Sequence, residues 1–310
     1  MKFLVLGRGF AAYGYTPALV YLGHEVYVPE KLYQRLRIYQ FVNPEDYYRV
    51  KIFDCRDKSF DAIVLALRPF EITKNFSKLE SLITPKTHIY FEKPVSEDPL
   101  QGLELFRRSE HLGAKFTVNY SFLWTPWYQK VQHKIERANH VVCKWDFIAR
   151  FNVDRENWKS LHSQGGGALL FYAIHFLSLV PLSREVEVLG ASLTTTTVGD
   201  SRVNCLLSLS KEDTSQRSIF EIHLDFKSKK TQFSITTDGV EAYTSDDPFL
   251  NPNLDPTIKN SSLDRRFSNL KKYIISSQDI KHYELMNQKA MQTQKMLIKV
   301  VTQLSKKHLN

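Results

Sequence analysis

The sequence lacks a long hydrophobic run and contains few cysteines. No apolar segment approaches the roughly 20 residues needed to cross a bilayer, so no membrane-spanning helix is expected. The apolar start is interrupted at residues 7–9, and it is too short for a secretory signal. Cys55, Cys143 and Cys205 are odd in number, far apart and without metal-ligand spacing. These absences favour a reduced, cytoplasmic protein without a metal site.

The charge pattern lacks the features of a nucleic-acid-binding protein. The formal net charge is +9, but the 42 basic residues are interspersed with 33 acidic residues. No lysine/arginine tract, zinc-finger spacing or RNA-binding aromatic signature is present. The positive charge suits an anionic cofactor or a phosphorylated metabolite instead. We therefore expect a small-molecule substrate, with neither nucleic acid nor membrane as a partner.

The first 30 residues have the arrangement of a dinucleotide-binding unit. Residues 3–6 form a short continuous apolar run, as expected of a strand that is buried on both faces. Gly7, Gly9 and Ala12 follow with the spacing G-x-G-x-x-A, and a helix is expected next. Residues 24–30 then alternate like a second strand and end on an acid. This order favours a Rossmann site over a glycine turn in an unrelated α/β protein.

Each of these positions has a physical role at a dinucleotide. Gly7 permits the tight turn, Gly9 lets the backbone approach a pyrophosphate, and Ala12 lets the helix pack closely on the strand. Free N–H groups at the helix N-terminus would face the phosphates. Glu30 lies about 20 residues further on, where a carboxylate accepts hydrogen bonds from ribose hydroxyls. It favours NAD slightly over NADP, although the neighbouring Lys31 weakens this preference.

Strands and helices alternate up to residue 120 and predict a doubly wound parallel sheet. Further strands are expected at residues 50–53, 61–67, 88–92 and 115–120. Ligands of such sheets bind beyond the carboxyl ends of the strands. The residues expected at that edge are Arg68, Glu92, Lys93, Pro94, Asn119 and Tyr120. We therefore place a dinucleotide-binding Rossmann domain at residues 1–120.

After residue 120 the sequence changes to β-rich segments joined by turn residues. Strands are expected at residues 141–151, 186–197, 202–210, 218–226 and 230–244. These segments predict an open, mostly antiparallel sheet in a second α/β domain, which we place at residues 121–310. Residues 281–310 have apolar positions at helical spacing, so a C-terminal helix is expected to pack back on the protein.

Several motifs follow one another in a fixed order along the chain. They are Gly7-Arg8-Gly9-Phe10-Ala11-Ala12, Glu92-Lys93-Pro94, Val118-Asn119-Tyr120 with Pro126, Trp158-Lys159, and Gly165-Gly166-Gly167-Ala168 with His175. In this combination the chain resembles the glucose–fructose oxidoreductase/inositol dehydrogenase (Gfo/Idh/MocA) family. The resemblance implies a Rossmann domain and a second domain whose large sheet forms a homodimer or a higher homo-oligomer. It also implies NAD(P)-linked oxidation or reduction of a sugar, cyclitol or sugar nucleotide.

The resemblance also assigns roles to individual residues. The cofactor would contact Gly7, Gly9, Phe10, Ala12, Glu30, Arg68, Glu92, Lys93 and Pro94. Lys93 would lie near the nicotinamide, where its ammonium stabilises developing alkoxide charge and burial lowers its pKa. A cis bond into Pro94 would direct Lys93 into the cleft. His175 would be the general acid/base, because the pKa of histidine lies near the working pH.

The residues expected to bind the substrate are Lys93, Asn119, Tyr120, Trp158, Phe171, Tyr172 and His175. Other aromatic candidates for stacking on a sugar or base, with the protein core as their alternative, are Trp124, Trp127 and Tyr128. The chain departs from the family at Phe171, where the resemblance implies an aspartate four residues before the histidine. Phenylalanine neither binds substrate hydroxyls nor assists the histidine.

Three functions therefore stay open at this point. The preferred one is an NAD(P)-dependent oxidoreductase that acts on a carbinol or carbonyl carbon of a sugar derivative. The second is a cofactor-binding sensor or partner subunit without turnover, which Phe171 motivates. The third is a reductase of a non-sugar substrate. Three of these residues also have a structural alternative. For Lys93 it is a solvated residue at a strand end, for His175 a core residue, and for Arg68 a strand cap.

Overall fold

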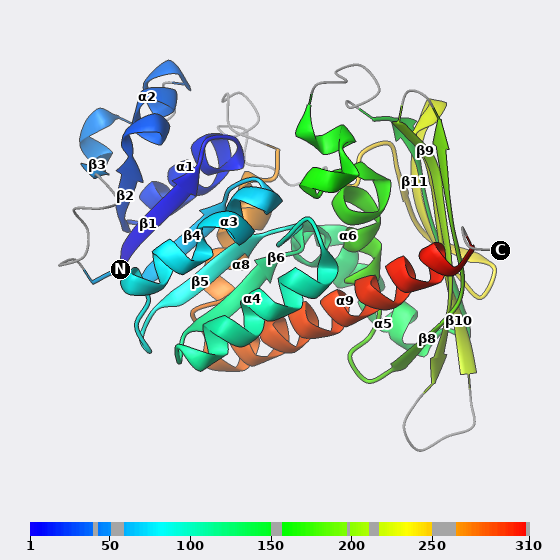
Figure 1. Ribbon diagram of the computed structural model, residues 1–310. Helices are drawn as coiled ribbons and strands as arrows, with labels where there is room; N and C mark the ends of the chain where they lie inside the picture. The colour runs from blue at the N-terminus through cyan, green and yellow to red at the C-terminus, as the bar shows by residue number, and fades with distance from the viewer. Residues whose placement is uncertain are drawn as a thin grey trace.

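The computed structural model describes residues 1–39, 43–50, 59–149, 157–196, 199–210, 217–249 and 265–307. Two sheets of 6 strands each stand at opposite ends of the molecule, with helices around and between them (Figure 1). The expected α/β class with two different sheets is confirmed. Cys55 and residues 51–53 of one predicted strand lie outside the described residues.

The first sheet is parallel throughout, as the alternating pattern predicted. Its strands lie in the order β3-β2-β1-β4-β5-β6. They are β1 (Lys2–Gly7), β2 (Glu25–Pro29), β3 (Tyr47–Val50), β4 (Ala62–Ala66), β5 (His88–Glu92) and β6 (Lys115–Asn119). Of the strand predicted at residues 50–53, only Val50 can be compared, and it lies in β3, which begins at Tyr47. The order reverses between β1 and β4, and ligands of such sheets bind outside the carboxyl ends at this point.

Helices cover both faces of the first sheet, which explains the continuous apolar runs of its central strands. The covering helices are α1 (Thr16–Tyr21), α2 (Glu30–Tyr39), α3 (Pro69–Leu79), α4 (Pro99–His111) and α8 (Phe267–Ser276). Leu4 of β1 belongs to a core that includes buried residues of α3 and α4. Phe3 belongs to the opposite core, with buried residues of α1, α2 and α8. The sequence analysis did not predict α2.

The second sheet is mostly antiparallel, as expected. Its strands lie in the order β12-β11-β7-β10-β9-β8, and only β7 and β10 among these neighbours pair in parallel. They are β7 (His140–Ile148), β8 (Glu185–Thr196), β9 (Gly199–Ser210), β10 (Arg217–Asp225), β11 (Lys227–Thr237) and β12 (Val240–Ser245). The segment predicted as one strand at residues 230–244 is two strands. They meet at Asp238 and Gly239, whose φ angles of 49° and 80° make a tight turn.

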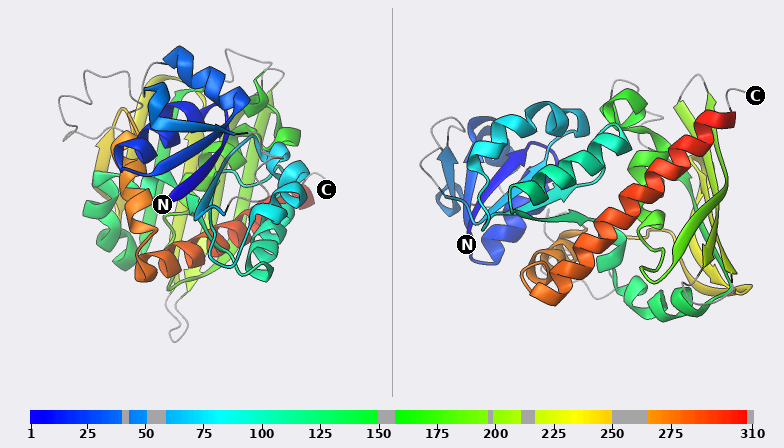
Figure 2. Two further views of the ribbon diagram at one scale, coloured as in Figure 1. Left: turned by 90° about the vertical axis from the view of Figure 1, so that its left-hand side faces the viewer. Right: turned by 60° about the horizontal axis from the view of Figure 1, so that its bottom comes forward.

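Two helices connect the second sheet to the first. In α5 (Pro126–Arg137), Trp127 and Val131 are buried. The long α9 (Ile280–Lys307) packs on α4, β6 and β8, and it runs diagonally from beside the first sheet to the second sheet (Figure 2). The C-terminal helix thus packs back on both parts of the fold. Among the described residues, no helix combines the length and apolar character that a bilayer crossing requires.

A buried lysine in α9 gives a testable pH dependence. Lys289 Nζ donates to the carbonyl oxygen of Val180, and burial lowers the pKa of Lys289 to about 7. An unfolded lysine titrates near pH 10.4, so the unfolded chain binds more protons between these values and stability rises with pH. We expect the Tm to rise from pH 7 to pH 9, and to rise less in Lys289→Met, by thermal unfolding. Equal slopes in the two proteins would contradict the lowered pKa.

Candidate active site

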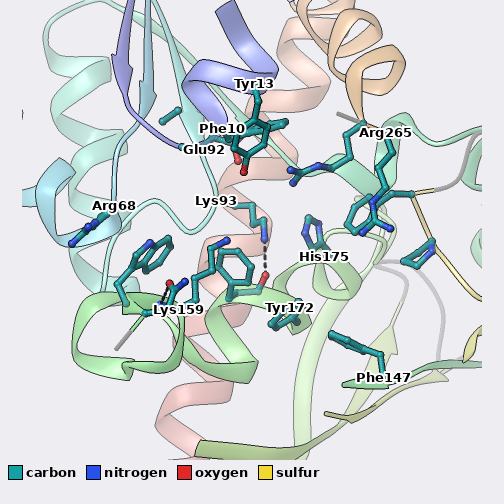
Figure 3. Close-up of a pocket in the computed structure, with 18 of the residues that line it drawn as sticks. Phe10, Tyr13, Arg68, Glu92, Lys93, Phe147, Lys159, Tyr172, His175 and Arg265 are labelled. Atoms are coloured by element: carbon teal, nitrogen blue, oxygen red, sulfur yellow. Dashed lines mark hydrogen bonds between the residues drawn. The ribbon is translucent and has the colours of Figure 1, made fainter. Parts of the chain in front are cut away.

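A cavity of about 1260 Å³ opens beyond the carboxyl ends of the central strands of the first sheet (Figure 3). Gly9, Leu67 and Lys93 line it, and they follow β1, β4 and β5. The opposite wall includes His175 and, from the second sheet, Phe147. The cavity therefore lies between the two parts of the fold, at the edge where the sequence predicted ligand binding.

The glycine turn after β1 borders this cavity. Gly7 has a φ angle of +124°, and a Cβ atom there would lie 2.1 Å from the carbonyl oxygen of Ala66. Only glycine therefore lets β1 and β4 approach at this point. Gly9 lines the cavity, and a Cβ atom there would meet nothing within 4 Å. The protein's own packing does not require glycine at position 9, whereas a pyrophosphate lying over this backbone does.

Two of the helical segments that border the cavity are π-helical. The first, Ala11–Tyr15, follows the glycine turn and leads into α1. The second, Leu169–Ala173, leads into α6 (Ile174–Leu177), which carries His175. The sequence analysis predicted a helix after the glycine turn, without its π-helical start. Such segments are rare and are frequently found at functional sites, so their position supports a function for this cavity.

Glu92 ends β5 and holds the backbone that carries Lys93. Its Oε1 atom accepts hydrogen bonds from the Tyr15 hydroxyl at 2.8 Å and from Asn119 Nδ2 at 2.7 Å. Burial raises the pKa of Glu92, and both hydrogen bonds act against this rise. Asn119 is 2% exposed, so it supports Glu92 from within the protein. These bonds join the first helix to the ends of β5 and β6.

Lys93 points into the cavity and contacts the helix of the opposite wall (Figure 3). Its Nζ atom donates a hydrogen bond to the carbonyl oxygen of Phe171 at 2.6 Å. The same atom lies 3.8 Å from the centre of the Phe171 ring. The bond between Lys93 and Pro94 is cis, as the resemblance implied. The carbonyl oxygen and the ring of Phe171 thus hold the ammonium at the wall. Neither group is an anion, so a ligand can replace them.

The charge state of Lys93 depends on its surroundings. Burial lowers the pKa of Lys93 to about 7; Glu92 opposes this shift, while Arg266 and Lys159 add to it. An ordinary lysine titrates near pH 10.4, so it stays charged at neutral pH. Lys93 instead exchanges its proton close to pH 7, which is the range required of a general acid/base.

His175 lies on the same cavity, but its proton affinity differs from the expectation. The side chain is 2% exposed, stacks on Phe122 at 4.6 Å and meets the edge of Phe249 at 5.8 Å between ring centres. Burial lowers the pKa of His175 well below its ordinary value, and Lys93 adds to the effect. The ring is therefore neutral at pH 7. Its Nδ1 atom has no hydrogen-bond partner among the residues that the structure describes.

The cavity brings most of the predicted residues together. Those on its wall are Gly9, Phe10, Arg68, Glu92, Lys93, Trp158, Phe171, Tyr172 and His175. Three further predicted residues are buried or partly buried and adjoin lining residues in the sequence: Gly7, Ala12 and Pro94. Tyr120 is 1% exposed and packs in the core, so the structure does not place it for substrate contact. Trp127 is also buried, and its Nε1 atom donates to the carbonyl oxygen of Pro248 at 2.7 Å.

Glu30 turns toward β3 instead of the cavity wall. Its Oε2 atom lies 3.2 Å from Arg49 Nη1, and Oε1 accepts a hydrogen bond from Gln34 at 2.6 Å. Arg8 and Arg35 line the cavity near the glycine turn, since α2, which carries Arg35, packs against the π-helix Ala11–Tyr15. The glycine-turn end of the cavity therefore presents guanidinium groups.

Sequence reasoning missed other residues on the wall, including Lys159, Arg265 and Arg266. Lys159 had a signal, because it directly follows Trp158 in one of the motifs. Arg265 and Arg266 precede α8, far along the chain from every motif, and no spacing connects them to the site. The wall also includes Tyr13, Trp145 and Phe147.

No family model matches the chain, and no curated protein matches it in sequence. Solved structures do match in fold. The WlbA dehydrogenase from Bordetella pertussis, in complex with NADH and UDP-GlcNAcA, has a TM-score of 0.72 and 13% identity, covering 99% of this chain and 96% of its own. KijD10, a 3-ketoreductase from Actinomadura kijaniata in complex with NADP and TDP-benzene, has a TM-score of 0.68 and 14% identity, covering 98% of both chains.

A third structure, the super-repressor mutant of Gal80p from Saccharomyces cerevisiae, has a TM-score of 0.72 and 9% identity. The match covers 99% of this chain and 96% of the Gal80p chain. At such low identities these matches establish the fold. The two-part architecture that the resemblance implied is confirmed by them.

Proposed function

We propose that this chain is an NAD(P)-dependent oxidoreductase, which moves a hydride between nicotinamide and a carbinol or carbonyl carbon of a sugar, cyclitol or sugar-nucleotide derivative. One observation carries the proposal: the glycine turn at Gly9, Lys93 and His175 all line the same cavity. Fold relatives in complex with NADH or NADP and a nucleotide-linked ligand support it.

The bound nicotinamide supplies the hydride acceptor or donor. Lys93 donates a hydrogen bond to the reacting oxygen of the substrate and stabilises its negative charge in the transition state. With a pKa of about 7, Lys93 also accepts the hydroxyl proton during oxidation and returns it during reduction. His175 is neutral at pH 7 and its lowered pKa makes it a weak base, so its ring accepts a hydrogen bond from the substrate hydroxyl and Lys93 takes the proton. The aromatic groups around it keep water away from the reacting atoms.

We propose that the cofactor is NADP(H) and that Arg8 and Arg35 bind its 2′-phosphate. The sequence favoured NAD through Glu30, but Arg49 and Gln34 already engage that carboxylate. An exposed ion pair of this kind contributes at most about 1 kcal/mol, so the pair alone would not exclude NAD. The guanidinium groups on the cavity wall supply the charge-assisted hydrogen bonds that a phosphate prefers.

A thermal-shift titration tests the cofactor proposal. We expect NADPH to raise the Tm more than NADH at equal concentration, with a dissociation constant lower by about tenfold. Arg35→Ala should weaken NADPH binding by about 10- to 150-fold, since one charged hydrogen bond contributes about 1.5–3 kcal/mol, and leave NADH binding almost unchanged. Lys144→Ala on the second sheet is a control for lost charge. No stabilisation by either cofactor would overturn the proposed function itself.

A cofactor-binding protein without turnover is the second candidate. The Phe171 carbonyl and ring hold Lys93 at the cavity wall, where an acid would have assisted the histidine. The Gal80p structure of the same fold is described as a super-repressor mutant, which is compatible with a regulatory role. Binding of NADPH together with no reduction or oxidation across a broad panel of sugars, sugar nucleotides and non-sugar carbonyl compounds would favour it over the oxidoreductase.

We also propose that the chain forms a homo-oligomer through the open face of the second sheet. That face carries Leu206, which is 37% exposed, beside its strand partner Glu221. Glu221 accepts hydrogen bonds from the Nε2 atoms of His140 and His223, both at 2.8 Å, so its carboxylate is already satisfied.

The proposed location is the cytoplasm. Cys143 and Cys205 are free thiols, which supports a reducing compartment.

A further inference from the structure

Tyr15 is a buried polar side chain that the proposed mechanism does not use. It ends the π-helix Ala11–Tyr15 and is 0% exposed, so a ligand in the cavity does not reach it. The ring of Phe10, which lines the cavity, packs on Tyr15 edge-on, with the ring centres 5.5 Å apart. Tyr15 therefore acts on the site only through the groups that its hydroxyl contacts.

That hydroxyl is directed at the carboxylate of Glu92. It donates to Oε1 at 2.8 Å, and Asn119 Nδ2 donates to the same oxygen at 2.7 Å. Burial raises the pKa of Tyr15 well above its ordinary value, so the hydroxyl keeps its proton and stays a donor. Two donors on one oxygen favour the ionised form of a carboxyl group.

The charge of Glu92 matters because the next residue is Lys93. Both side chains border the cavity (Figure 3). Burial raises the pKa of Glu92, whereas the hydrogen bonds from Tyr15 and Asn119 lower it. Burial lowers the pKa of Lys93 to about 7, and Glu92 opposes this shift. The two donors thus support the charge on Lys93 indirectly, since they keep its neighbouring carboxylate ionised.

We propose that Tyr15 is a positioning residue, whose hydroxyl, together with Asn119, holds Glu92 as an ionised carboxylate beside Lys93 and so keeps a proton on Lys93 for transfer. This inference rests on the proposed function, in which Lys93 is the proton-transfer group, and extends it to a residue outside the cavity. The alternative is that the bond only ties the first helix to the end of β5, and that the charge of Lys93 is independent of it.

Other charged or titratable groups also face this pair. Arg266, which precedes α8, lowers the pKa of both Glu92 and Lys93, and Lys159 lowers that of Lys93. Two further titratable groups lie nearby, Tyr273 of α8 beside Glu92 and His175 of α6 beside Lys93. Replacing Tyr15 with phenylalanine leaves all of these groups in place, so it changes only the hydrogen bond to Glu92.

A nuclear magnetic resonance titration of the cofactor-free protein tests the inference. The side chains of lysine are labelled with ¹³C, and the Lys93 signal is identified by its loss in Lys93→Met. In the parent protein we expect a midpoint at about pH 7. An opposite charge nearby changes a midpoint by about 1–3 pH units, so Glu92→Gln should lower it by about that amount and Tyr15→Phe by at least about 0.5.

Two further variants complete this test. Asn119→Ala removes the second donor to the same oxygen and should also lower the midpoint, so it tests the arrangement even if Tyr15→Phe does not fold. Tyr90→Phe is the matched control: it removes another buried hydroxyl of β5, which accepts from Ser277 at 2.8 Å, and should keep the midpoint. An unchanged midpoint in folded Tyr15→Phe or Asn119→Ala, or an equal shift in Tyr90→Phe, overturns the inference.

The pH profile of turnover separates this inference from the proposed function. Lys93 accepts the proton during oxidation in its neutral form, so kcat for oxidation should rise with pH through the Lys93 midpoint. In Tyr15→Phe this rise should move to lower pH by the same amount as the titration of Lys93. A shifted titration with an unchanged kcat profile would overturn the role of Lys93 in the proposed function. The titration itself needs neither cofactor nor substrate, so the two failures are distinguishable.

Discussion

Replacing Lys93 with methionine should lower kcat by about 10²–10⁴-fold, the usual effect of removing a proton-transfer group or a transition-state hydrogen-bond donor. Methionine keeps an unbranched apolar stem but has no ammonium. The Nζ atom lies in the cavity and donates to the Phe171 carbonyl on the wall that also carries His175, so its loss affects the reacting oxygen. The glycine turn lies at another part of the cavity, and the dissociation constant of NADPH should stay within about threefold.

Lys289→Met is the matched control for this experiment. Lys289 is also buried, and burial also lowers its pKa to about 7, but its partner is the Val180 carbonyl, next to the end of α6. This variant should change the pH dependence of Tm and leave kcat unaltered. The comparison therefore separates the effect of removing a buried ammonium from the effect of removing the one at the cavity. Unaltered kcat in Lys93→Met would exclude Lys93 from the mechanism.

Much of the first sheet is predictable because its sequence signals are local. Residues 3–6 are apolar without alternation since helices cover both faces of β1. Gly7 is required by the nearby Ala66 carbonyl and by a positive φ angle, and both constraints act within one strand pair. The motif Glu92-Lys93-Pro94 was placed correctly at the end of β5. Each of these features follows from sterics over a few residues.

Features that depend on distant packing were not predictable in the same way. In the π-helix Leu169–Ala173, backbone hydrogen bonds join residues five apart instead of four. The spacing of apolar residues in the sequence does not reveal this difference. The low pKa of His175 arises from burial, and the rings that contact it include Phe122 and Phe249, which lie far away in the sequence. The sequence predicted that His175 titrates near neutral pH. Burial instead lowers its pKa well below that range and lowers the pKa of Lys93 to about 7.

The missed helix α2 shows a different limit. Leu32 and Leu36 are buried and four residues apart, which is a helical spacing. Polar and charged residues surround these two leucines, so the helical pattern is weak in the sequence. This helix matters for function because it carries Arg35 to the cavity wall. The sequence predicted a preference for NAD from Glu30. This residue begins α2, and its side chain lies against Arg49 instead of the cavity.

The two glycines of the first turn should respond to substitution in opposite ways. Gly9→Val should weaken NADPH binding by at least about 100-fold, equivalent to about 2.7 kcal/mol, while the Tm of the cofactor-free protein stays the same. A Cβ atom at position 9 meets nothing within 4 Å and extends the wall into the cavity. The added side chain therefore occupies the space proposed for the pyrophosphate without disturbing the protein around it.

Gly7→Ala should instead destabilise the protein before any cofactor is added. The backbone has a φ angle of +124°, and the new Cβ atom would lie 2.1 Å from the Ala66 carbonyl oxygen, so β1 and β4 must separate. Thermal unfolding of both cofactor-free variants, followed by titration with NADPH, measures the two effects independently. If Gly9→Val bound NADPH as tightly as the parent protein, no diphosphate could lie over this turn. The position of the nicotinamide beside Lys93 and His175 would then lose its physical basis, whatever the stability of Gly7→Ala.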